Sequence, residues 1–143
     1  MHPSEILKNV RTALVIDWPS RDVPESLVWA GFQVHVHGGP GPTDYSVYEL
    51  NDGQIAERHI GRPPEQAELV YSYRPFNELP QIIATAKALH AETIWTQSGL
   101  SAPGVKDPKG CFVPHEELEH ARQLVESAGM RYVSEPYIGD VVR

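Results

Sequence analysis

The chain has 143 residues, which is the length of one ordinary domain and too short for two full domains. Its apolar fraction of 41% and charged fraction of 22% are typical of a globular protein and exclude a disordered one. The net charge of −7 argues against general binding to nucleic acid or anionic membranes, because both require a basic surface. Binding of a small anionic ligand is still compatible with this charge. Charges are screened over about 8–10 Å, so a few arginines and backbone amides near the ligand outweigh the net charge of the protein.

The cysteine content and the hydropathy of the chain indicate the cellular compartment in which the protein is expected. Cys111 is the single cysteine, so an internal disulfide is excluded and nothing favours an oxidising compartment. No stretch approaches 18 apolar residues, and the first residues lack the apolar core of a signal peptide. We therefore expect a cytoplasmic protein, monomeric or a small homo-oligomer, with a small-molecule ligand and with no nucleic-acid or membrane partner.

The first part of the chain predicts a β-α-β unit. Thr12–Ile16 is apolar without alternation, which is typical of a central strand buried on both faces. A short helix through residues 24–30 ends at Gly31, because glycine readily takes the left-handed conformation that follows a helix. A second strand is expected over Phe32–His37, followed by the Gly-Gly-Pro-Gly-Pro loop at residues 38–42.

The middle of the chain predicts a hairpin, a strand and a helix. Residues 45–50 and 54–59 flank Asn-Asp-Gly, a turn that favours positive φ. Residues 68–73 are expected to form a strand, and the apolar positions of 76–90 have helical spacing.

The last part of the chain continues the alternation. A strand is expected at 93–96, then a loop over 101–114 whose length is often functional. A helix is expected over 114–128, with Gly129 just past its end, and a last strand over 130–134.

This order predicts an α/β fold in a single domain over residues 1–143. The sheet is expected to be doubly wound, mostly parallel and Rossmann-like, with about five strands, helices on both faces and an inserted β-hairpin. Ligands of such sheets bind outside the carboxyl ends of the strands, near the point where strand order reverses. The segments that leave these ends are 17–21, 37–42, 73–75, 97–100 and 135–137.

Two strand endings carry a resemblance to a known family. The segment 69–75, Leu-Val-Tyr-Ser-Tyr-Arg-Pro, is similar to an apolar strand that ends in an aromatic-Arg-x-Pro type of turn. The segment 93–100, Thr-Ile-Trp-Thr-Gln-Ser-Gly-Leu, is similar to a strand that ends in Trp-x-Gln-x-Gly. With these motifs and the order of its last elements, the chain resembles the CoA-binding domain family, small stand-alone Rossmann-like proteins related to the CoA-binding domain of the succinyl-CoA synthetase α subunit. The resemblance covers nearly the whole chain, in layout more than in residues over the first half.

The resemblance implies non-catalytic binding of coenzyme A or an acyl-CoA at the carboxyl ends of the strands. Together with the topology, it gives a set of candidate ligand-binding residues: Asp17, Trp18, Ser20, Arg21, His37, Gly38, Gly39, Tyr73, Arg74, Pro75, Gln97, Ser98, Gly99 and Tyr137.

Two departures from the family pattern bear on this expectation. The family's first strand leads into a Gly-x-Ser turn, where this chain has Asp17-Trp-Pro-Ser20. Asp17 adds a negative charge and Pro19 removes an amide donor, whereas Ser20 and Arg21 supply a hydroxyl, an amide and a cation. The last strand ends in Ser-Glu-Pro-Tyr at 134–137, where many relatives have Asp-Arg-Cys. The ligand is therefore bound in an altered way, or binding has been lost.

Several candidates have a structural interpretation beside the functional one. Arg74 is either a phosphate or ribose contact or a surface arginine paired with a carboxylate. Ser20 and Arg21 either bind ligand or cap the following helix. The glycines at 38 and 39 either allow close approach of a ligand or form an ordinary loop, and they lack the dinucleotide fingerprint.

Other residues are candidates for metal binding, catalysis or packing. His35 and His37 share a strand face, but no third ligand is placed beside them, so no metal site is expected. Cys111 is interpreted as a loop thiol without a paired histidine. Trp29 and Trp95 are expected in the core or in helix packing, and Trp18 is placed to stack on a base.

Two other functions remain open. One is an enzyme that acts on another nucleotide or a phosphorylated metabolite through Asp17, Ser20, Arg74 and the His37 region. The sequence offers no coupled nucleophile and base for it, so catalysis is not expected. The other is a degenerate scaffold that binds a protein partner through the hairpin and the 102–113 loop.

Overall fold

The computed structural model describes residues 3–8, 10–16, 21–39, 41–72, 74, 76–96 and 118–134. Within this part, the helices are α1 (Pro3–Leu7), α2 (Asp22–Trp29), α3 (Leu79–Ala88) and α4 (Leu118–Ser127), with a 3-10 turn, η1 (Phe76–Glu78), before α3. The strands are β1 (Thr12–Ile16), β2 (Gln33–His37), β3 (Tyr45–Asn51), β4 (Gln54–His59), β5 (Leu69–Ser72), β6 (Thr93–Thr96) and β7 (Arg131–Val133).

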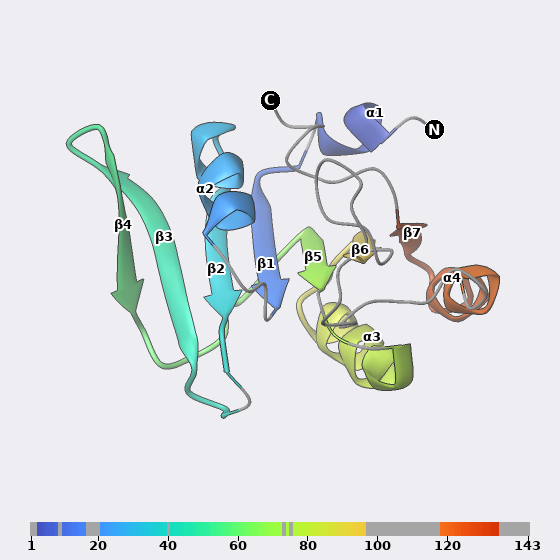
Figure 1. Cartoon of the computed structure of the whole chain (residues 1–143). Helices are drawn as coiled ribbons and strands as arrows, with labels where there is room; N and C mark the ends of the chain where they lie inside the picture. The colour runs from blue at the N-terminus through green and yellow to red at the C-terminus, as the bar shows by residue number, and fades with distance from the viewer. Residues whose placement is uncertain are drawn as a thin grey trace.

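All the described strands belong to one sheet, in the order β4-β3-β2-β1-β5-β6-β7 (Figure 1). The strands β2, β1, β5, β6 and β7 pair in parallel, and β3 and β4 are added antiparallel at the β2 edge. The α/β, mostly parallel, Rossmann-like architecture is therefore confirmed. The expected count of about five strands is too low, because the hairpin continues the hydrogen-bonded ladder and makes the sheet seven-stranded.

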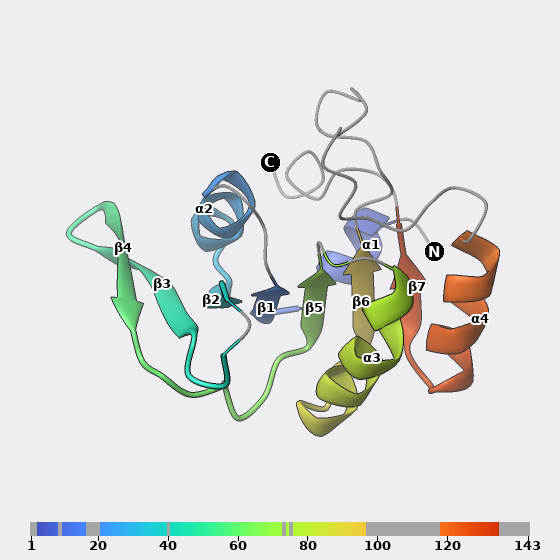
Figure 2. The same cartoon turned by 60° about the horizontal axis from the view of Figure 1, so that its bottom comes forward.

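Helices cover both faces of the sheet. Figure 2 shows α2 on one face and α3 and α4 on the other. The residues of β1 alternate between the two cores: Ala13 and Val15 belong to the core that includes Leu27 of α2, and Leu14 and Ile16 belong to the one that includes Ile82 of α3. This double burial explains why β1 is apolar without alternation.

The predicted turns have the expected backbone geometry. Gly31 has φ +97°, its N–H donates to the carbonyl of Val28, and the chain closes α2 as a glycine at a helix end does. Asp52 and Gly53 both have positive φ, 53° and 79°, which is the turn that matches the twist of a two-residue hairpin.

Some packing details differ from the expectation. Trp95 is buried as predicted, but Trp29 is 61% exposed. The buried residues of α2 are Val23, Pro24, Leu27 and Val28, and position 29 lies about 100° further around the helix. Helix α1, for which no element was predicted, adds Ile6 and Leu7 to the core. No helix in the described part of the chain is long and apolar enough to cross a membrane.

Candidate functional site

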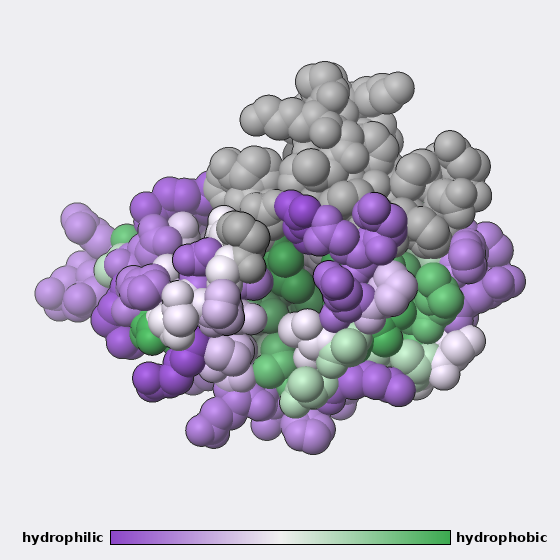
Figure 3. Space-filling view, turned by 90° about the horizontal axis from the view of Figure 1, so that it is seen from below, coloured by the Kyte–Doolittle hydropathy of each residue, from purple (hydrophilic) through white to green (hydrophobic). Residues whose placement is uncertain are grey.

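A pocket of about 580 Å³ lies at the carboxyl ends of β1, β2 and β5, beside α3. This volume is within the usual range for small-ligand sites. Strand order reverses here, because β2 lies on one side of β1 and β5 on the other, and such a point is where doubly wound sheets bind ligands. Figure 3 views this end of the sheet and shows apolar surface in its middle, with hydrophilic residues around it.

Two walls form the pocket. The sheet side contributes Ile16 at the end of β1 and His37, Gly38 and Gly39 at the end of β2. The opposite side is formed by Arg74, after β5, and by Glu78, Gln81, Ile82 and Thr85. The members of this second wall from 78 to 85 recur at helical spacing and share one face of the η1–α3 segment.

Arg74, at the end of β5, is hydrogen-bonded to Ser72 and Glu78. Its backbone N–H donates to the buried Ser72 hydroxyl at 3.1 Å. Its guanidinium binds Glu78 through both carboxylate oxygens, from Nε to Oε1 at 3.0 Å and from Nη2 to Oε2. The pairing with a nearby carboxylate, one of the two interpretations of Arg74, is therefore present. Arg74 also lines the pocket, and its contact with a ligand stays a prediction.

His37 is fixed on the rim by the loop and the hairpin. Its Nε2 lies 2.8 Å from the carbonyl oxygen of Gly41, and because a carbonyl only accepts, Nε2 carries the proton. Its ring stacks on Tyr45 of β3, with ring centroids 4.2 Å apart and planes inclined by 9°. Burial raises the pKa of Tyr45, so its hydroxyl stays protonated. The imidazole thus presents a fixed edge to the pocket.

The loop after β2 is shaped around Asp44. The Asp44 carboxylate accepts a hydrogen bond from the Gly41 N–H at 2.8 Å, and the Gly38 N–H donates to the Asp44 carbonyl at 3.1 Å. A Cβ on Gly39 would lie 2.6 Å from the carboxylate oxygen Oδ2 of Asp44, and one on Gly41 would lie 2.8 Å from it. A side chain at position 39 or 41 would therefore force Asp44 to move, and the same loop brings Gly38 and Gly39 to the pocket.

Arg21 lies away from this pocket. Its Nε binds Glu25 at 2.9 Å, and its guanidinium lies 5.1 Å from the centre of the Tyr48 ring. Tyr48 belongs to the core under α2, on the opposite face of the sheet from α3. The structure therefore does not bring Arg21 together with Arg74.

The structure describes only part of the predicted site. The candidates that lie outside the described residues are Asp17, Trp18, Ser20, Tyr73, Pro75, Gln97, Ser98, Gly99 and Tyr137. Cys111 and the 102–113 loop also lie outside them. Among the described candidates, His37, Gly38, Gly39 and Arg74 line one pocket.

Sequence reasoning missed the wall contributed by α3. Glu78, Gln81 and Thr85 stand at helical spacing after Arg74, beside the buried stripe that was predicted for this helix. This spacing was a usable signal, because residues that follow a ligand-proximal strand end on one helical face share the same crevice.

The other histidine of β2, His35, lies on the same face of the sheet as His37. His35 is half-buried beside Val47, and burial first, then the nearby Arg58, lower its pKa. In the described part of the chain, no group of three His, Cys, Asp or Glu residues is arranged to hold a metal ion.

Comparisons with known proteins agree with this architecture. The fold is similar to that of a Thermus thermophilus protein, described as cell-free ID.343, with a TM-score of 0.58 and 21% identity over 99% of this chain and 96% of that one. No curated protein matches the chain. The family model described as CoA binding domain matches residues 17–139. The chain therefore belongs to the CoA-binding domain family.

Proposed function

We propose that this protein binds coenzyme A or an acyl-CoA, without transforming it, in the pocket at the ends of β1, β2 and β5. One observation carries the proposal: in a chain of the CoA-binding domain family, the pocket lies where strand order reverses and has an arginine in its wall. A phosphate of the ligand is placed beside Arg74, because a guanidinium binds phosphate through two parallel hydrogen bonds.

The rest of the lining suits a nucleotide-type ligand. Gly38 and Gly39 allow backbone to approach the ligand closely. Ile16 and Ile82 offer apolar contact for a base or a pantetheine arm, and Gln81 and Thr85 offer hydrogen bonds. A small number of polar groups around an apolar floor is the usual composition of such a site.

The lining also favours binding over catalysis. His37 is the described residue of the pocket best suited to act as a base, because the proton on Nε2, which donates to the Gly41 carbonyl, leaves Nδ1 as the unprotonated ring nitrogen. The described lining offers two groups that could serve as nucleophiles, the Thr85 hydroxyl and the Glu78 carboxylate. Within the described residues, Glu78 is bonded to Arg74 and neither group is hydrogen-bonded to His37. Nucleophilic catalysis normally needs such a pair within hydrogen-bond reach.

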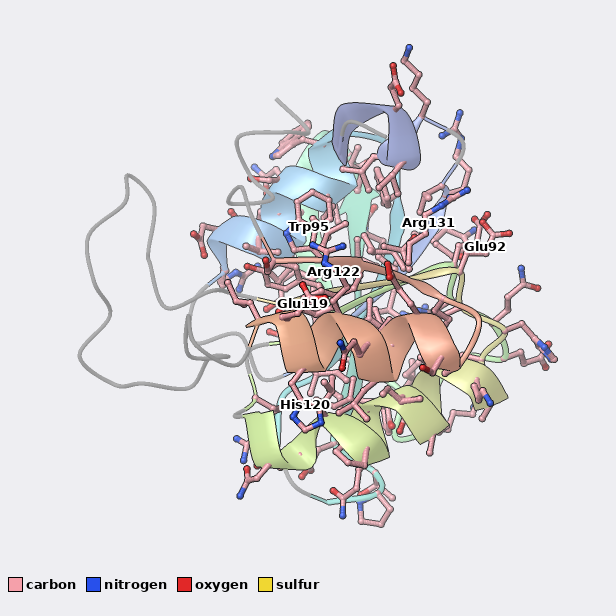
Figure 4. The ribbon with its side chains drawn as sticks, turned by 90° about the vertical axis from the view of Figure 1, so that its right-hand side faces the viewer. Glu92, Trp95, Glu119, His120, Arg122 and Arg131 are labelled. Carbon is pink, nitrogen blue, oxygen red and sulfur yellow. The ribbon has the colours of Figure 1, made fainter. Side chains whose placement is uncertain are left out.

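Calorimetric titration with coenzyme A and acetyl-CoA tests the proposal. Arg74→Gln is expected to weaken binding about tenfold or more, since a hydrogen bond to a charged group contributes about 1.5–3 kcal/mol. Arg131→Gln is the matched control, because Arg131 lies at the amino end of β7 beside Glu92 (Figure 4). A thermal shift checks the same point, as ligand at 100 times its Kd stabilises a protein by about 2.7 kcal/mol. Absence of binding at millimolar concentrations of both ligands would contradict the proposal.

A further inference from the structure

Three arginines in the described chain pair with a glutamate four residues later. The pairs are Arg21–Glu25, Arg74–Glu78 and Arg122–Glu126. Arg21 lies over Tyr48 and Arg122 over Tyr132, so each of these two guanidinium groups also packs on an aromatic ring. The Arg74–Glu78 pair differs, because both of its members line the pocket.

Glu78 takes the same kind of contact that a phosphate would take. Both of its carboxylate oxygens engage the Nε and Nη2 groups of Arg74, in the two-bond geometry that arginine also uses for phosphate. Its negative charge lies in the pocket wall and offsets that of Arg74. A phosphate that approaches Arg74 therefore meets a carboxylate already bound to it.

The pair is accessible to a competing anion. The side chains of Arg74 and Glu78 are each 33% exposed and both line the pocket, so an anion in the pocket can reach the guanidinium. The two-bond geometry makes the pair stronger than an ordinary surface ion pair, so a single weakly charged group does not displace it. Glu78 stands directly before α3, and its side chain makes no capping hydrogen bond there. A carboxylate released at this position stays near the amino end of a ten-residue helix, where negative charge is favoured.

We infer that Glu78 is a resident counter-anion, which a phosphate group of the ligand replaces on Arg74; this rests on the proposed binding of coenzyme A in this pocket. Glu78 lowers the affinity of the site for every anion. The site therefore discriminates between ligands by the negative charge of the group that approaches Arg74. A phosphate group with two negative charges competes effectively with one carboxylate for Arg74, whereas a monoanionic carboxylate does not. The site is thereby reserved for phosphorylated ligands.

The test compares wild type with Glu78→Gln and Glu126→Gln in calorimetric titrations with coenzyme A and with inorganic pyrophosphate. Glu78→Gln is expected to bind both about fivefold more tightly or better, since couplings between two binding events typically range from about 5- to 150-fold. Glu126→Gln removes the same charge from a pair of the same spacing outside the pocket, and its affinities should equal those of wild type. Glu78→Ala is a second variant, and Arg74→Gln combined with Glu78→Gln should abolish the gain.

The outcomes separate this inference from the proposed function. If Glu78→Gln binds coenzyme A less tightly than wild type or equally well, Glu78 only orients Arg74, and the inference is wrong while coenzyme A binding stands. If pyrophosphate binding is strengthened but coenzyme A does not bind, the proposed ligand is wrong and the role of Glu78 holds. If neither anion binds any variant, both are overturned.

Discussion

The two ends of the parallel strands are built differently. At the amino ends, the strands are tied together: Oε1 of Glu68 accepts from the Arg11 N–H at 2.9 Å and from the Thr12 hydroxyl at 3.3 Å, and that hydroxyl accepts from the Glu68 N–H. At the carboxyl ends, polar side chains surround a hollow of about 580 Å³. One end uses its polar groups to close the fold, and the other keeps them around a space for a ligand. Variants of the residues that line the hollow should therefore change binding, and variants of residues outside its lining should change stability alone.

Among the variants that test this comparison, Gly39→Ala is expected to have the largest effect on stability and binding. The new Cβ would lie 2.6 Å from Asp44 Oδ2, so the exposed Asp44 side chain has to move and loses its hydrogen bond from the Gly41 N–H, at a cost of about 1–3 kcal/mol. Coenzyme A affinity should fall as well, because the loop lines the pocket. Urea unfolding and calorimetry measure the two effects. In an Asp44→Ala background, Gly39→Ala should cost less stability, and an equal cost in both backgrounds would show that the clash is not the cause.

The two threonines at opposite ends of β6 provide a matched pair. Thr96 Oγ1 is buried and lies 2.7 Å from the Tyr132 hydroxyl. Thr93 Oγ1 is also buried, at 1% residue exposure, and has no hydrogen-bond partner among the residues that the structure describes. Thr96→Val should lower the free energy of unfolding by about 1–2 kcal/mol, because it leaves a buried hydroxyl unpaired. Thr93→Val should leave it unchanged or raise it by up to about 1 kcal/mol. Equal losses in chemical denaturation would refute this distinction.

The smallest effect is a pH dependence in the middle of β2. Burial, aided by Arg58, lowers the pKa of His35 below its ordinary value of 6.5. The unfolded state then binds more protons than the folded state, so stability is complete above pH 6.5 and falls as the pH drops toward the folded pKa. His35→Gln should flatten this part of the curve of unfolding free energy against pH. An unchanged slope in the variant would assign the dependence to other groups.

Much of the fold was predictable because its signals are local. The unbroken apolar run of β1, the glycine after α2 and the Asn-Asp-Gly turn each determine backbone geometry within a few residues. The union of the hairpin with the parallel sheet was not predictable in this way, since alternation indicates a strand and not its partner. Trp29 was placed wrongly because its helical stripe depends on where α2 packs.

Only one wall of the candidate site, the one formed by the strand ends, was predicted from the sequence. Topology gave the strand ends, and four described candidates, His37, Gly38, Gly39 and Arg74, do meet at one pocket. The wall formed by Glu78 and α3 has helical spacing in the sequence, but spacing gives only the shared helix face and not how the helix packs over the sheet. Arg21 and Arg74 have the same spacing to a glutamate, yet they lie on opposite faces, so sequence spacing alone does not distinguish them.

The stacking of His37 on Tyr45 gives the hairpin a role beyond extending the sheet. Both groups that brace the imidazole, the Tyr45 ring and the Gly41 carbonyl, belong to the segment that enters the hairpin and not to the parallel strands. The rim of the pocket is thus shaped by an addition at the sheet edge. Substitutions in the hairpin can therefore change the shape of the pocket rim without altering the parallel strands of the core.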